Sequence, residues 1–102
     1  MVWEGTIFMR ADVFVSQTES GGVEISVVKH GMSSGAARKY DTSQKAKEVL
    51  LAFGIDAVTV ERQLQILLTT PPNVLVRLPT VEIADDILGS LGFKAAAFMG
   101  AA

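Results

Sequence analysis

Two short apolar segments near the start of the chain predict a β-hairpin. Residues 11–17 and 23–29 are rich in β-branched and aromatic residues that partly alternate with polar ones, as in strands with one buried face. Residues 19–22 separate them and end in two glycines, which suit a tight turn between antiparallel strands. Residues 6–10 either form an earlier strand or extend the first strand through a bend near Arg10.

An amphipathic helix is predicted over residues 43–53. Residues 41–43 each carry a side-chain oxygen that can cap its N-terminus, and Gly54 stands where helices commonly stop. Its apolar positions fall at i, i+3, i+4 and i+7: Ala46, Val49, Leu50 and Phe53.

The segment 56–68 fits a helix and a strand equally well. A helical face at 57, 60, 61, 64, 67 and 68 is apolar except at Glu61, and a strand face at the even positions 58–68 is apolar except at Arg62. Thirteen residues is long against a mean strand of about 5–6, and Asp56 offers an N-cap oxygen. We therefore predict a helix, with a strand as the open alternative.

The rest of the chain completes an α+β pattern. Two prolines interrupt regular secondary structure at 69–73. After them the sequence predicts a strand over 74–78, a helix from 83 or 84 to 91 and a last strand over 93–99. The expected fold is one domain, residues 1–102, with a small mixed sheet of four to five strands and two or three helices packed on one face. The element order is β-β-α-α-β-α-β, and residues 38–40 are a candidate short strand before the first helix.

Composition narrows the class of protein. The chain of 102 residues is 49% hydrophobic and 20% charged, which suits one folded core rather than a disordered polymer. It has no cysteine and a single histidine, so we expect no disulfide and no metal site. No apolar run reaches the roughly 18 residues of a membrane span. We expect a soluble, cytoplasmic protein with no membrane contact.

The charges gather in one segment. The formal net charge is −2, yet residues 29–47 hold five basic residues and one acidic residue. Because residues 29–37 are rich in glycine and serine, we interpret them as a loop. That loop, with the basic residues around it, is a candidate anion site for a nucleotide or another phosphate-bearing ligand, nucleic acid being less favoured by the net charge. Its candidate residues are Lys29, His30, Ser33, Ser34, Arg38 and Lys39. A solvated loop is the alternative.

One short motif suggests catalysis, but its context does not support an enzyme. Residues 31–35 match G-x-S-x-G, the turn that holds a nucleophilic serine in α/β hydrolases. Such a serine needs a large supporting sheet and a histidine from elsewhere in the fold, whereas His30 lies in the same loop. We expect no catalytic residue and no cofactor.

These observations favour a non-enzymatic interaction or regulatory module that binds itself or another protein. Residues 95–102 carry no charge and would be an apolar patch if exposed. We therefore predict that Phe98 and Met99 lie in an interface, the alternative being that they complete the domain's own core. The anion-binding module is the second hypothesis for function.

Overall fold

The computed structural model describes residues 8–29, 34–84 and 87–97. Six strands and three helices occur in these ranges. In chain order they are β1 (Phe8–Gln17), β2 (Val23–Lys29), β3 (Ser34–Tyr40), α1 (Ser43–Ala52), α2 (Ala57–Leu68), β4 (Val76–Arg77), β5 (Val81–Ala84), α3 (Ile87–Ser90) and β6 (Lys94–Ala97).

The strands form one sheet in the order β4-β1-β2-β3-β6, and β5 pairs with the first residues of β1. Every pairing among the described strands is antiparallel. The predicted hairpin is confirmed, with Val13 opposite Val27 and Val15 opposite Ile25. Strand β1 has ten residues. The side of β1 that does not pair with β2 is therefore long enough to pair with both β4 and β5.

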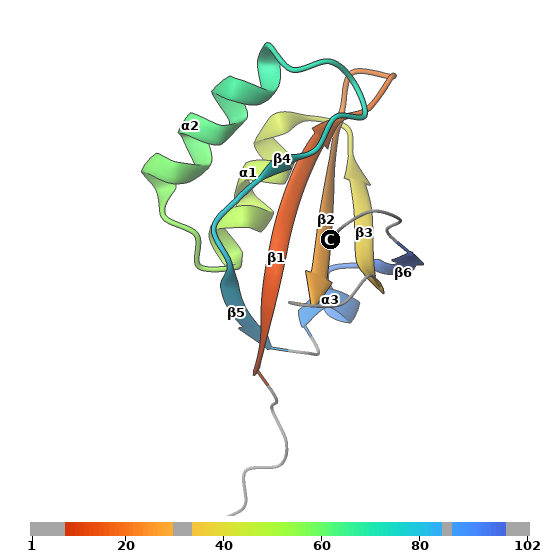
Figure 1. The fold of residues 1–102 in the computed structure, drawn as a ribbon, viewed down its shortest axis with the longest axis vertical. Helices are drawn as coiled ribbons and strands as arrows, with labels where there is room; N and C mark the ends of the chain where they lie inside the picture. Colours follow the sequence, from red (N-terminus) through yellow and green to blue (C-terminus); the bar gives the residue numbers. More distant parts are fainter. Residues whose placement is uncertain (1–7, 30–33, 85–86, 98–102) are drawn as a thin grey trace, which may run out of the picture.

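The helices cover one face of the sheet. Helices α1 and α2 lie side by side on it, with α1 against β2 and β3 and α2 against β1 and β4 (Figure 1). The core between the layers is made of fully buried aliphatic side chains. The largest are Val13, Val15, Ile25, Val27, Leu50, Val60 and Leu78. Side chains of α3 pack against the same core. The expected α+β class with helices on one face is therefore confirmed.

Helix α1 has both ends that its sequence predicts. Thr42 is the N-cap, and its side-chain oxygen accepts a hydrogen bond from the Lys45 N–H at 3.3 Å. At the other end Gly54 has a φ of 90°, a left-handed conformation that glycine adopts without strain. Ile55 N–H then bonds the Leu50 carbonyl at 3.4 Å, which closes the helix in a Schellman motif.

Residues 57–68 form helix α2, as predicted, and not a strand. The Asp56 carboxylate accepts from the Thr59 N–H at 3.1 Å and caps the N-terminus. At the C-terminus the Gln17 amide donates to the Thr70 carbonyl at 2.8 Å and also to the Leu67 carbonyl. The end of α2 is thereby attached to the end of β1. At twelve residues, α2 is the longest described helix, and no helix in the described ranges is long and apolar enough to cross a bilayer.

Four details differ from the predicted fold. Strand β3 begins at Ser34, within the segment interpreted as a loop, because residues 35–40 pair with β2. Residues 81–84 form β5 against β1, so the predicted helix there is reduced to the four residues of α3. The strand expected over 74–78 pairs only at Val76–Arg77, and the sheet is antiparallel where a mixed one was expected.

Candidate functional site

Helix α2 carries more apolar side chains than it buries. Of its residues only Val60 and Leu67 are fully buried, and Leu64 packs partly on the core. Val58 is 64% exposed, Ile66 45% and Leu68 72%. An amphipathic surface helix normally turns one apolar stripe to its core and polar residues to water. The outward side of α2 departs from that pattern.

The sequence of α2 explains both sets of apolar residues. Positions 57, 60, 64, 67 and 68 follow helical spacing and include the buried residues, while 58 and 66 lie outside that stripe and 68, at its end, is exposed. These three are also among the residues that made the strand pattern match as well as the helix pattern. The ambiguity of the segment therefore arises from a second apolar set that the fold leaves exposed. We call Val58, Arg62 and Ile66 the α2 surface. Leu68 lies about 160° around the helix from Ile66 and lines the side toward α1.

A shallow hollow lies beside this surface, between α1 and α2. Its volume is about 240 Å³, and it is lined by Ser43, Lys47, Glu61, Leu64, Gln65 and Leu68. Leu64 and Leu68 give it apolar walls, and the remaining residues give it a polar rim. Such a mixture of apolar wall and polar rim is common where proteins bind a side chain of a partner.

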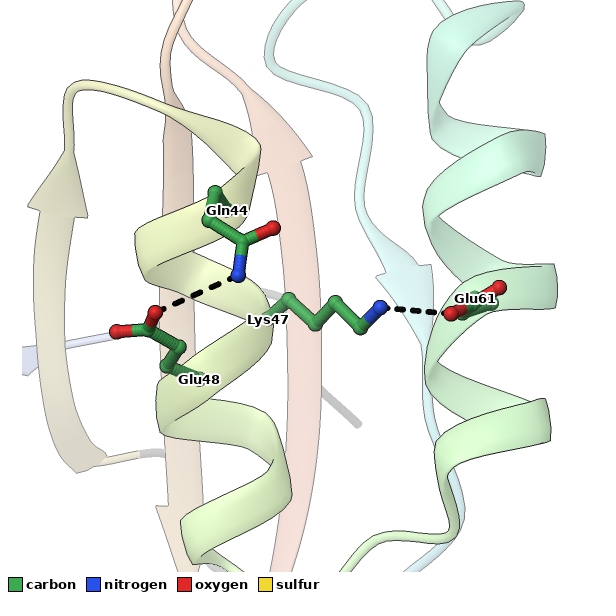
Figure 2. A network of polar contacts seen from close by, with 4 residues as sticks. All are labelled: Gln44, Lys47, Glu48 and Glu61. Atoms are coloured by element: carbon green, nitrogen blue, oxygen red, sulfur yellow. Dashed lines mark hydrogen bonds and ion pairs between the residues drawn. The ribbon is translucent and has the colours of Figure 1, made fainter.

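An ion pair bridges the two helices at the hollow. Lys47 of α1 reaches Glu61 of α2, with 2.6 Å between Nζ and Oε2, whereas Gln44 and Glu48 pair with each other on α1 (Figure 2). The hydrogen bond and the positive charge of Lys47 lower the pKa of Glu61. Glu61 therefore stays ionised at neutral pH, and the hollow has a fixed negative group beside a fixed positive one.

Arg62 is the charged member of the α2 surface. It is exposed, and it forms no hydrogen bond or ion pair with another described residue. By contrast, the neighbouring Glu61 is paired with Lys47. One positive charge thus lies between two exposed apolar residues, Val58 and Ile66, at a spacing of four residues on each side.

Other exposed apolar side chains lie apart from α2 along the chain. Phe8 is at the start of β1, and Val74 and Leu75 precede β4. The segment before β4 is attached to the hairpin, since Asn73 N–H bonds the Gln17 carbonyl at 2.9 Å. Scattered exposed apolar residues are normal in folded proteins, so these positions by themselves indicate no site.

The structure separates the residues predicted to bind an anion. Lys29 ends β2 and Ser34 begins β3, next to each other at one end of these strands. His30 and Ser33 lie outside the described residues. Arg38 pairs with Ile25, four residues from Lys29, which is about 13 Å along a strand. Lys39 is on the opposite face of the sheet from Arg38, because side chains alternate along β3.

Arg38 already has partners within the protein. Its guanidinium donates to the Leu91 carbonyl and lies 4.9 Å from the ring centre of Tyr40. It also packs under Gly92, where a Cβ would come within 3.0 Å of Nη1. These contacts hold β3 to the turn before β6. Arg38 is thus engaged structurally, which weakens its candidacy as an anion ligand.

The remaining predicted positions carry no described site. Phe98 and Met99 lie outside the described residues, as do residues 31–33 of the G-x-S-x-G match. Gly35, its last residue, is in β3, where a Cβ would lie 2.0 Å from the Val27 carbonyl oxygen. Close strand packing therefore explains that glycine. In the described ranges, no three acidic or histidine side chains gather to hold a metal ion.

Comparison of the chain with protein-family models, with curated proteins and with solved structures finds no match. The function must therefore be inferred from the geometry of the described surfaces.

Proposed function

We propose that this protein is a non-enzymatic interaction module that binds another protein molecule through the α2 surface. The observation that carries the proposal is the exposure of Val58 and Ile66 on a single helix. Each is a large apolar side chain, and burying it against a partner removes about 25 cal/mol of unfavourable hydration per Å².

The local polar groups support binding of a protein. Lys47 and Glu61 neutralise each other at the hollow, so apolar contact there does not require an unpaired charge to be desolvated. Arg62 supplies one directional contact for a carboxylate at the centre of the surface. An arginine between exposed apolar side chains, beside a hollow with a polar rim, is a composition found at many interface centres.

The anion-binding hypothesis remains a prediction. No described contact favours it, because Arg38 is occupied by the Leu91 carbonyl and the Tyr40 ring. We also place the protein in the cytoplasm, since a chain without cysteine suits a reducing compartment.

A photo-crosslinking amino acid in place of Ile66 tests the proposal in the cells that make the protein. The matched control carries the same amino acid at Gln44, which is exposed on α1. We expect discrete crosslinked species from position 66 that are absent from position 44. The absence of crosslinked species at 66, or the same species at both positions, would refute the proposed function.

A further inference from the structure

One face of the sheet carries no described helix, yet side chains on it are buried. In β2, Ile25 and Val27 belong to the core under the helices, so the alternate residues Ser26 and Val28 point to the other face. Ser26 is 2% exposed and Val28 3%. Helices α1 and α2 lie on the first face (Figure 1), and α3 packs against the same core. Something other than the described helices therefore covers Ser26 and Val28.

The strand neighbours of Val28 cannot cover it. On one side lies Gly35 of β3, which has no side chain, and on the other lies Asp12 of β1. The Asp12 carboxylate accepts hydrogen bonds from Arg77 at 3.0 Å and Thr80 at 2.9 Å, which lie beyond β1 as seen from β2. Because side chains stand roughly perpendicular to a sheet, burial of Val28 requires atoms above it. Val28 is buried within the single chain, so those atoms belong to this chain.

Residues 98–102 have the reach and the composition for this position. They follow β6, whose last residue, Ala97, pairs with the first residue of β3. Two strand spacings, about 10 Å, separate β6 from β2, and five residues span up to about 17 Å. The five are Phe, Met, Gly, Ala and Ala, with no charge. On β3, the residues beside the buried pair of β2 are Gly35 and Ala37, so no large side chain blocks the path there.

The other segments outside the described ranges start farther from the covered positions. Residues 30–33 join the end of β2 to the start of β3, and Ser26 lies about 10 Å back along β2 from its last residue. Residues 1–7 precede Phe8, which pairs with β5 about 10 Å beyond the end of β2. Residues 85–86 link β5, on the far side of β1, to α3. Residues 98–102 are thus the apolar segment best placed to cover both side chains.

We propose that residues 98–102 turn back across β3 and lay Phe98 and Met99 over Ser26 and Val28. The sheet then has helices on one face and this apolar segment on the other. In this arrangement the two residues complete the domain's own core, which is the alternative to the interface predicted from the sequence. The inference does not depend on the α2 surface.

Nuclear Overhauser contacts in the wild-type protein test the placement directly. We expect cross-peaks between the Val28 methyl groups and the ring protons of Phe98. The methyl groups of Val60, which is fully buried on α2 at the other face of the sheet, are the control and should give none to Phe98. No contact between Val28 and residues 98–102, or contacts between Val60 and Phe98, would overturn the proposal.

Thiol labelling tests the cover in a second way, because the chain has no cysteine of its own. Ser26→Cys places one thiol at the covered position. In the full chain, adding Phe98→Ser and Met99→Ser should speed its labelling by about tenfold or more, since the segment then loses the apolar burial that holds it. Phe8→Ser, the same change at an exposed phenylalanine, is the matched control and should leave the rate unchanged.

A thiol in the core under α2, introduced by Val60→Cys, separates loss of the cover from loosening of the whole fold. Its labelling should stay slow in every variant. Labelling of Ser26→Cys that is unchanged by the two serine substitutions, or accelerated equally with that of Val60→Cys, would overturn the proposal. The crosslinking at position 66 is independent of both results, so the proposed function is tested separately.

Discussion

The Lys47 ammonium on α1 lies 2.6 Å from the Glu61 carboxylate on α2. The two residues join the two helices, and they line the hollow beside the α2 surface. Lys47 lowers the pKa of Glu61 in the folded protein. The pair therefore favours the folded state above the ordinary pKa of a glutamate, and this contribution disappears as the pH falls through the lowered pKa.

Replacing Lys47 with methionine should raise the pKa of Glu61 towards its ordinary value. Methionine keeps most of the apolar stem but removes the charge and the hydrogen bond. The measurement is an NMR titration of the side-chain carboxyl carbons. Lys45→Met is the control and should leave the pKa of Glu61 where it is in the wild type. An unchanged pKa in Lys47→Met would show that the ion pair does not form.

Gln17→Ala should lower the free energy of unfolding by about 1–3 kcal/mol, because two carbonyl groups at the end of α2 lose their donor. The side-chain amide of Gln17 bonds the Leu67 and Thr70 carbonyls. Urea denaturation measures the change. Gln44→Ala, at an exposed site on α1, should shift the same quantity by less than about 0.5 kcal/mol. Equal effects of the two substitutions would contradict the bridging role of Gln17.

Gly35→Ala should destabilise the protein by about 1–3 kcal/mol or more through overpacking. A Cβ at this position would lie 2.0 Å from the Val27 carbonyl oxygen and 2.8 Å from the Val28 Cα, both backbone atoms. Gly89→Ala is the matched control, since nothing lies within 4 Å of a Cβ there. It should leave stability unchanged or raise it by about 0.4–1 kcal/mol. Thermal melts of both variants decide the point, and a neutral Gly35→Ala would argue against the β2–β3 packing.

Tyr40→Phe should leave the free energy of unfolding unchanged or raise it by about 1 kcal/mol. The Tyr40 ring is buried beside Phe93, with ring centres 6.4 Å apart, and its hydroxyl has no hydrogen-bond partner among the described residues. Burial raises the pKa of this hydroxyl, and the nearby charge of Arg38 offsets part of the rise. Phenylalanine keeps the ring contacts and removes the unpaired group. A loss of more than about 1 kcal/mol in urea denaturation would indicate a missing partner for the hydroxyl.

The hairpin and α1 were predictable because several local signals agree. In β1 and β2 the alternation of residue types coincides with a Gly-Gly turn, and Gly21 does adopt a left-handed φ of 93°. In α1 the apolar spacing, the Thr42 cap and the Gly54 stop all indicate the same helix. When helix or strand propensity, apolar patterning and capping all indicate the same element, tertiary contacts rarely change that element.

Strands β3 and β5 depended on pairing that the local sequence does not display. Residues 35–37 of β3 are Gly and Ala, which are poor strand formers, and they form a strand because β2 lies beside them. Residues 81–84 form β5 because the first residues of β1 extend far enough to pair with them. Such long-range partners cannot be read from a short window of sequence.

The exposed apolar residues of α2 were visible in the sequence, but the sequence did not show which side of the helix would face the core. The apolar residues at 58, 66 and 68 appeared as a competing strand pattern. Only the packing of α2 on β1 and β4 shows that Val60 and Leu67 face the core and that Val58, Ile66 and Leu68 do not. The basic segment was easier to notice, yet its residues are distributed over two ends and two faces of the sheet.

The most direct measurement is photo-crosslinking from position 66 compared with position 75 in the cells that make the protein. Ile66 on α2 and Leu75 before β4 are apolar residues of similar exposure. We predict discrete crosslinked species from position 66 that are absent from position 75. No crosslinked species from position 66, or the same species from both positions, would contradict the account.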